Sequence, residues 1–122
     1  MTPFGLKLRS LRKERGLTMV TLADGLGVSP AYLSALEHGK RGRPTFALLQ
    51  GIIHILGIIW DEADELIRLA DLSDPRVTID TAGLEPAATL LANRLSREIG
   101  GLDERALASL IAVLDQASAR SA

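Results

Sequence analysis

The regular alternation of glycines and hydroxyl-bearing residues in the first half of the chain constrains its fold more than any other feature. Gly16 is followed two positions later by Thr18, and Gly27 is followed in the same way by Ser29. Glycine ends a helix because it adopts the left-handed conformation without strain. Serine and threonine begin one because their hydroxyl oxygen accepts a hydrogen bond from a free backbone N–H group. With Pro30 reinforcing the second start, these signals predict short helices joined by tight turns.

The segments between these signals show the spacing of apolar residues that is typical of amphipathic helices. In the first segment Phe4, Leu8 and Leu11 share one side. Leu6 lies beside this side in the pattern, and Val20 counts among the apolar positions of the second helix. Aromatic residues make up only 3% of the chain, which favours helices over β-sheets. We therefore expect an all-α fold that begins with five helices, over residues 4–15, 18–26, 30–37, 46–56 and 61–70.

The fourth expected helix is apolar on nearly all sides. One stripe consists of Phe46, Leu49, Ile53 and Leu56, and a second consists of Leu48, Ile52, Ile55 and Ile59. A helix with two apolar stripes must be covered on two sides. We expect the first three helices to cover one side, and either the C-terminal half or a second subunit to cover the other. Ile52, Ile55 and Ile59 are therefore predicted to lie in a dimer interface.

The C-terminal part is predicted to be a helical hairpin after a linker. Residues 72–85 have the composition of a linker, within which residues 76–80 form either a short strand or an extended arm. Two amphipathic helices follow, over residues 86–99 and 104–117, separated by Gly100 and Gly101. Each is too short to be stable alone in water, so the hairpin must pack on a partner. The residues predicted to form this dimer interface are Leu91, Leu95, Leu107, Leu110, Ile111 and Leu114.

The charges of the chain are divided between its two halves. Residues 1–60 carry eight basic and three acidic side chains, whereas residues 61–122 carry six basic and twelve acidic ones. A basic half suggests a polyanionic partner, and the acidic half is then expected to face away from it. The alternative interpretation is a chance clustering of charges on solvated faces.

Several function classes are disfavoured by composition. The chain has no Cys and two His, so we expect no disulfide, no metal site and no cofactor. No apolar run reaches the roughly 20 residues that a membrane span needs. No arrangement of residues suggests nucleophilic or acid–base catalysis. We therefore expect a soluble cytoplasmic protein that is not an enzyme and does not bind a membrane.

The segment from Leu11 to Gly57 resembles the Xre/Cro/lambda-repressor-like helix-turn-helix family. The matching stretches are LRKERGLT at residues 11–18, LA at 22–23, LGVS at 26–29 and LSALEHGKR at 33–41. The resemblance implies a five-helix domain, which we place at residues 1–71. The composition and apolar pattern of the rest of the chain predict the linker at 72–85 and the dimerisation hairpin at 86–122. The resemblance also implies a bacterial regulator that acts at the nucleoid and binds double-stranded DNA with its third helix in the major groove.

The resemblance assigns base reading to six positions at the start of the third helix, namely Ser29, Pro30, Ala31, Tyr32, Ser34 and Ala35. Two of these, Ala31 and Ala35, have no group that can hydrogen-bond to a base. We therefore expect few direct base contacts and a contribution from DNA shape. For Tyr32 the alternative is a half-buried ring that touches only phosphate. Met19 stands where the family often has a glutamine that binds a phosphate.

Phosphate contacts are expected from basic and hydroxyl side chains around the third helix. They are Arg9, Arg12, Lys13, Thr18, Lys40, Arg41, Arg43 and Thr45. Lys40, Arg41 and Arg43 lie in the loop after that helix, and the alternative for them is an ordinary solvated loop. Arg12 and Glu37 match family positions that commonly form a structural ion pair.

Two functions follow from these observations. The first is a sequence-specific transcriptional regulator, expected to be a repressor, that binds a near-palindromic operator as a homodimer. The second is an interaction module such as an antitoxin, whose acidic C-terminal half binds a partner protein while its first half binds DNA.

Overall fold

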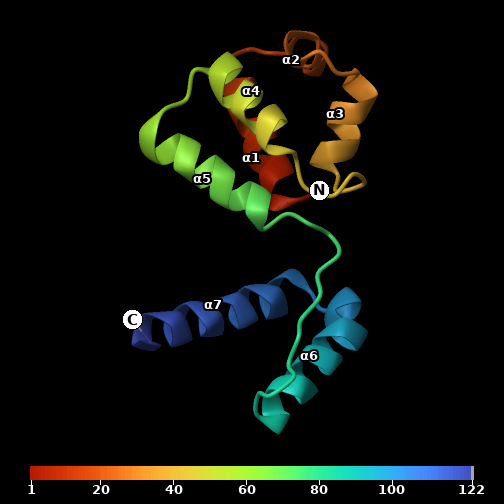
Figure 1. Ribbon diagram of the computed structural model, residues 1–122, viewed down its shortest axis with the longest axis vertical. Helices are drawn as coiled ribbons and strands as arrows, with labels where there is room; N and C mark the ends of the chain where they lie inside the picture. The colour runs from red at the N-terminus through yellow and green to blue at the C-terminus, as the bar shows by residue number, and fades with distance from the viewer. Residues whose placement is uncertain (122) are drawn as a thin grey trace. The chain divides into compact units, whose positions relative to one another are not determined.

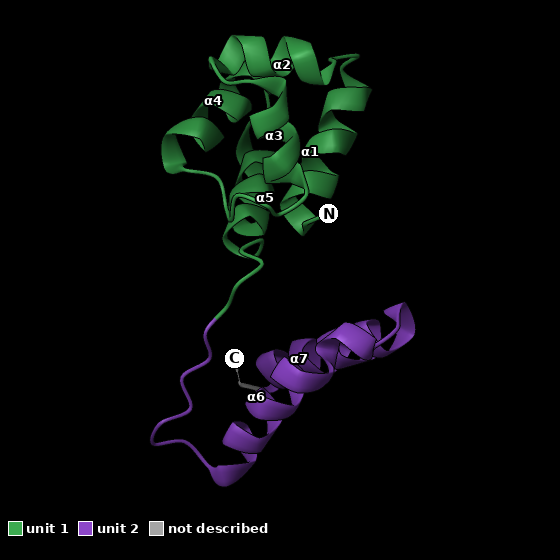
Figure 2. Ribbon diagram, turned by 90° about the vertical axis from the view of Figure 1, so that its right-hand side faces the viewer, with its two compact units in different colours: residues 1–77 green, residues 78–122 purple. Residues whose placement is uncertain are grey.

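The computed structural model describes residues 1–121 and divides into two compact units. The first unit is Met1–Val77, and the second begins at Thr78 (Figure 2). The described residues form seven α-helices and one turn of 3-10 helix, with no strand. The expected all-α fold is confirmed, and residues 76–80 do not form a strand. None of the helices within residues 1–121 has the length and apolar character that crossing a membrane requires.

The first unit contains the five expected helices (Figure 1). They are α1 (Pro3–Glu14), α2 (Met19–Leu26), α3 (Pro30–Glu37), α4 (Phe46–Leu56) and α5 (Trp60–Asp71). The side-chain oxygens of Thr2, Thr18, Ser29 and Thr45 accept hydrogen bonds from backbone N–H groups at the starts of α1, α2, α3 and α4. The helix starts are thus set by the hydroxyl residues of the sequence.

The turn between α2 and α3 fixes the position of α3. Gly27 ends α2 in the left-handed conformation, with a φ of 71°. The backbone N–H of Val28 then donates to the carbonyl of Ala23 at 3.1 Å, which closes the turn. Ala23 is fully buried, and α2 packs against both α3 and α4. A larger side chain at residue 23 would push these helices apart.

The core of the first unit is made of one side of each helix. Its largest fully buried apolar residues are Phe4, Leu8, Leu11, Leu22, Leu33, Leu36, Ile52 and Leu66. Leu6 and Val20 were predicted near this core, but both are more than half exposed. Each lies two positions from a buried residue, which corresponds to a rotation of about 200° around the helix. The side chains of Leu6 and Val20 therefore point away from the side that is buried.

The fourth helix lies largely within its own domain, which corrects part of the predicted dimer interface. Ile52 is fully buried in the core of the first unit and cannot contribute to a surface. Ile55 packs against α2, because a β-carbon on Gly25 would lie 3.0 Å from its Cδ1 atom. Phe46, assigned to the other stripe, is 73% exposed. Ile59 is also exposed, so it alone of the three α4-side candidates lies fully on the surface.

The first unit continues beyond the end of α5. Ser73 is buried, and its hydroxyl oxygen accepts a hydrogen bond from the backbone N–H of Phe4 at 2.9 Å. The same hydroxyl donates to the carbonyl of Leu69. This pairing attaches the segment after α5 to the start of α1, so residues beyond 71 belong to the first unit.

The second unit consists of α6 (Pro86–Glu98), the 3-10 turn η1 (Ile99–Gly101) and α7 (Glu104–Ser121). Asp103 caps α7 by accepting from the N–H of Ala106 at 2.8 Å. The two helices diverge from the turn at η1 (Figure 1). On α6, the guanidinium of Arg94 hydrogen-bonds to Glu98 and lowers the pKa of that carboxyl. No residue of α6 is buried, and Leu90 and Leu91 of this helix are more than half exposed.

Candidate nucleic-acid interface

The face of α3 that points away from the core is short and mostly apolar. Leu33, Leu36 and Glu37 are buried on the inner side. Ala31 is exposed and Ala35 half-buried on the outer side. Of the remaining predicted base-reading residues, Ser29 and Pro30 are exposed, and Tyr32 and Ser34 are half-buried. The six residues therefore lie on or beside one accessible face, as a helix that enters a groove requires.

Few of these side chains offer a free hydrogen-bonding group. The hydroxyl oxygen of Ser29 already accepts from the N–H of Tyr32 at 3.1 Å. Pro30, Ala31 and Ala35 have no polar side-chain atom. The face thus has little capacity to read bases through side chains of α3 itself.

His38, at the end of α3, adds a polar group that the sequence did not assign to the site. Its Nδ1 atom lies 2.9 Å from the carbonyl oxygen of Ser34. A carbonyl oxygen only accepts, so Nδ1 donates, and the neutral ring then presents Nε2 as an acceptor. His38 is exposed and follows Ala31 and Ala35 on the outer face. Its spacing from these residues was the available signal in the sequence.

Tyr32 and Arg41 lie together. The central guanidinium carbon of Arg41 is 5.6 Å from the centre of the Tyr32 ring, which is a cation–π distance. The loop that carries Arg41 leaves α3 directly, since the N–H of Lys40 donates to the carbonyl of Ala35 at 2.9 Å. A predicted base reader and a predicted phosphate ligand are therefore neighbours.

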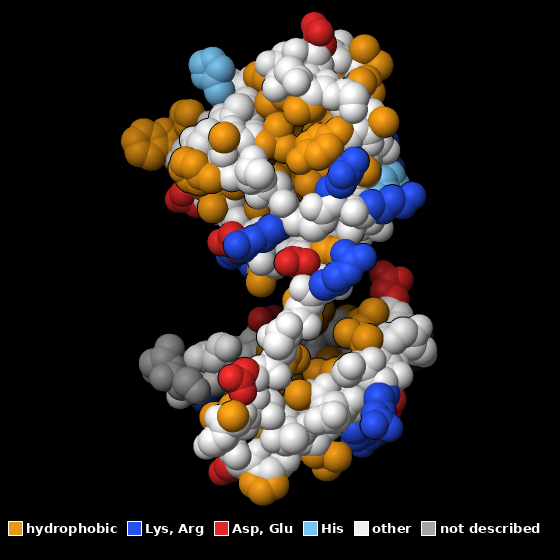
Figure 3. Space-filling model, turned by 45° about the vertical axis from the view of Figure 1, so that its right-hand side comes forward, with side chains coloured by type: hydrophobic (Ala, Val, Ile, Leu, Met, Phe, Trp, Pro, Cys, Tyr) orange, Lys and Arg blue, Asp and Glu red, His pale blue; other side chains and the backbone are white. Residues whose placement is uncertain are grey.

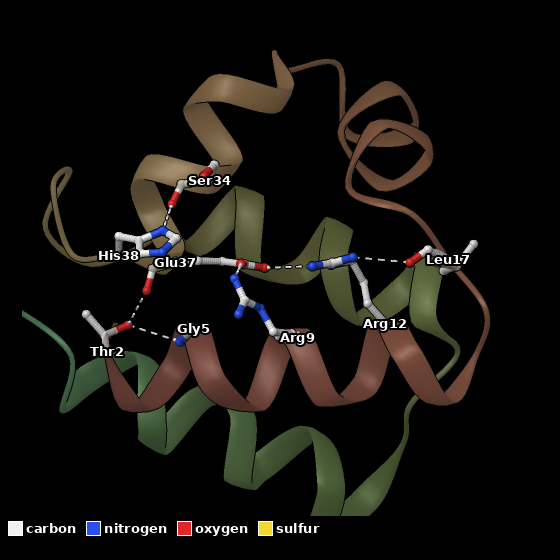
Figure 4. A network of polar contacts seen from close by, with 8 residues as sticks. All are labelled: Thr2, Gly5, Arg9, Arg12, Leu17, Ser34, Glu37 and His38. Carbon is white, nitrogen blue, oxygen red and sulfur yellow. Dashed lines mark hydrogen bonds and ion pairs between the residues drawn. The ribbon is translucent and has the colours of Figure 1, made fainter.

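A buried carboxylate joins α3 to α1 (Figure 4). Glu37 is fully buried, and its oxygens lie 3.6 Å from a guanidinium nitrogen of Arg12 and 3.8 Å from one of Arg9. Arg12 also donates to the carbonyl of Leu17 at 3.3 Å. The side chain of Arg12 is only 11% exposed. Its predicted phosphate contact is therefore corrected, because the guanidinium is occupied inside the domain.

Arg9 has a role that sequence reasoning missed. It was predicted to reach outward, yet its guanidinium is directed to Glu37 (Figure 4). Its side chain is 41% exposed, so one part of it faces solvent. The signal was present in the spacing, because residues three apart share one face of a helix.

The basic loop after α3 is accessible. Lys40, Arg41 and Arg43 are all exposed, and Lys13 on α1 is exposed too. Basic side chains gather on the first unit beside exposed hydrophobic ones (Figure 3). Arg43 is directed to Asp71 at the end of α5, with 3.3 Å between Nη1 and Oδ1. The two arginines of the loop are thus held by different partners, Arg41 by the ring of Tyr32 and Arg43 by Asp71.

The two predicted hydroxyl ligands both act as helix caps. Thr18 accepts from the N–H of Thr21 at 3.1 Å, and Thr45 accepts from the N–H of Leu48 at 3.2 Å. Both residues are exposed. They place the starts of α2 and α4, where free N–H groups and the helix dipole favour an anion.

The helix-turn-helix family model matches residues 8–61, which run from the middle of α1 to the start of α5. The uncharacterized HTH-type transcriptional regulator YazB of Bacillus subtilis is 36% identical to this chain over 59 residues. The alignment covers 48% of this chain and 84% of YazB. The chain belongs to the helix-turn-helix family of transcriptional regulators. The resemblance found in the sequence is thereby confirmed.

Two further relatives from Bacillus subtilis are named as HTH-type transcriptional proteins. The chain is 41% identical to the uncharacterized regulator RghRB and 44% identical to the transcriptional repressor RghR, each over 61 residues. Each alignment covers 50% of this chain, but 44% of RghRB and 45% of RghR. The chain thus spans less than half the length of these relatives. The family match ends at residue 61, before the second unit.

Proposed function

We propose that this helix-turn-helix protein is a sequence-specific DNA-binding regulator that represses transcription as a homodimer on a near-palindromic operator. The observation that carries the proposal is the accessible outer face of α3, followed at once by a loop of three exposed cations. A helix face of this kind fits the major groove, and the adjacent cations fit the phosphates that border it. The name of RghR, a transcriptional repressor, supports the choice of repression.

Phosphate binding is assigned to the groups that surround α3. Lys40 and Arg43 lie in the loop, and Lys13 projects from α1. Thr45 offers its hydroxyl proton at the start of α4, alongside the free N–H groups of that helix. The hydroxyl of Thr18 donates to the hydroxyl oxygen of Thr21 at 2.9 Å, so at the start of α2 the free N–H groups are the donors for phosphate. These contacts set the position of the protein on the duplex and contribute affinity that depends on salt.

Dimerisation is assigned to the second unit together with Ile59. Most of the large apolar residues of α6 and α7 are exposed, and Leu91, Leu110, Ile111 and Leu114 are all at least 40% exposed. Leu95 and Leu107 are half-buried. A single helix-turn-helix domain contacts few bases, so two linked domains are needed for useful affinity. Twofold symmetry then places the half-sites about one helical turn apart.

The experiment that tests this function is selection of bound duplexes from a random DNA pool, followed by sequencing. A palindromic consensus with half-sites about ten base pairs apart is the expected result. A single half-site without symmetry would contradict the homodimer. Folded protein that enriches no consensus would contradict sequence-specific binding, and would favour the antitoxin-like alternative in which the acidic part binds a partner protein.

A further inference from the structure

The recognition helix is short of long hydrogen-bond donors. Its most exposed positions include Pro30 and Ala31, and its hydroxyls belong to short side chains. Specific readout of guanine is achieved most often by a long cationic side chain that donates to O6 and N7. The chain offers no arginine or lysine on α3 itself. A donor for guanine must therefore come from a neighbouring segment.

Arg41 is the cation that the structure places beside α3. Its guanidinium lies over the ring of Tyr32, 5.6 Å from the ring centre. Tyr32 is half-buried, so its ring has limited freedom. A guanidinium stacked on such a ring loses less conformational entropy when it binds, because it is already partly oriented.

We propose that Arg41 is a specificity-determining residue that reads a guanine in the major groove, with the ring of Tyr32 as its supporting platform. The proposal rests on the proposed DNA-binding function. It predicts that one base of each half-site is a guanine. The planar guanidinium donates two hydrogen bonds to O6 and N7 of guanine while its face stays against the ring.

The other cations of the loop are less suited to this task. Arg43 is directed away from α3, towards Asp71 on α5, at 3.3 Å. Lys40 carries a single ammonium group, which cannot make a planar bidentate contact. Neither Lys40 nor Arg43 has a stacking contact with Tyr32 among the described residues. Arg41 thus differs from Lys40 and Arg43 in its contacts and its geometry, and not in its charge.

The test compares the base preferences of four variants with those of the unaltered full chain in the same selection from random duplexes. Arg41→Lys keeps the charge but removes the planar fork. Tyr32→Leu removes the ring, whereas Tyr32→Phe keeps the ring and removes the hydroxyl. Arg68→Lys, the same change at an exposed arginine of α5, is the control. Circular dichroism and thermal melting establish that each variant is folded.

We expect Arg41→Lys and Tyr32→Leu to reduce the preference for guanine at one and the same position by about tenfold. All other positions of the consensus should remain. Tyr32→Phe should preserve the preference, because cation–π stacking needs only the ring. Arg68→Lys should leave the preferences at every position unchanged.

Two results would overturn the inference in distinguishable ways. If the unaltered chain yields a consensus that Arg41→Lys retains in full, Arg41 contacts phosphate and the inference alone fails. If Tyr32→Phe abolishes the preference as strongly as Tyr32→Leu, the hydroxyl reads the base and the platform role fails. A folded unaltered chain that yields no consensus would remove the proposed function, and the inference with it.

Discussion

The backbone carbonyl oxygen of Glu37 occupies the space in which a β-carbon on Gly5 would have to sit. Helices α1 and α3 therefore approach each other as closely as their backbones allow. The same carbonyl accepts a hydrogen bond from the N–H of Thr2 at 3.1 Å. The end of α3 is thus held on the first turn of α1, and the absence of a side chain at residue 5 makes this possible.

Gly5→Ala should destabilise the first unit by about 1–3 kcal/mol, because the obstructing atoms are backbone and cannot move aside cheaply. Thermal or denaturant unfolding measures the effect. Gly51→Ala is the matched control within the same unit. There the new β-carbon would meet only the flexible end of Leu26, at 2.9 Å, and the gain in helix propensity offsets the contact. Equal stability of the two variants would refute this account of the α1–α3 contact.

Glu37 and Arg12 should behave as a coupled pair. Glu37→Ala leaves the mostly buried guanidinium of Arg12 without its carboxylate, which costs about 3–5 kcal/mol. The double variant Glu37→Met with Arg12→Met removes both charges, so it should lose less stability than the sum of the two single methionine variants. A double-mutant cycle from urea unfolding gives the coupling energy. Strict additivity would show that the ion pair contributes nothing.

The sequence predicted the helices well because their signals are local. Thr18 and Ser29 each cap the helix that they were expected to start, since a cap involves only the next three residues. The burial of Ile52 in the core could not be predicted from such local signals. Its helix is apolar on nearly every side, and periodicity does not tell which neighbour covers which side. Its burial depends on how α4 packs in the core that all five helices of the first unit build.

The candidate site was predicted less completely than the helices. The positions of the α3 residues follow from helical geometry, and their exposure agrees with it. The orientation of long cationic side chains does not follow from helical geometry, because Arg9, Arg41 and Arg43 each have several rotatable bonds. Which of them meets a carboxylate, a ring or solvent depends on residues distant in the sequence, such as Asp71, which lies 28 positions after Arg43.

Asp71→Asn should strengthen DNA binding about two- to fivefold at low salt. Asp71 holds Arg43 at 3.3 Å and so competes with phosphate for it. The pair is solvent-exposed, so its own contribution to stability is small, about 0–1 kcal/mol. Fluorescence anisotropy with a labelled duplex measures the affinity across salt concentrations, and the gain should fade as salt screens the charges. Asp61→Asn, at the opposite end of α5, is the control. A gain of the same size from both variants would point to net charge alone and not to Arg43.

Leu91→Asp and Leu110→Asp should convert the proposed dimer into monomers. Both leucines are exposed on the second unit, 53% and 40% respectively, and a buried aspartate at an interface would lose its hydration. Sedimentation equilibrium gives the mass of each variant. Loss of the dimer should also reduce the affinity for a duplex with two half-sites to that for a duplex with one. Ser109→Asp adds the same charge to α7 next to one of these positions and should leave the mass unchanged. Dimers that persist in both leucine variants would assign self-association to another surface, of which Ile59 is the first candidate because its side chain is 66% exposed in the first unit.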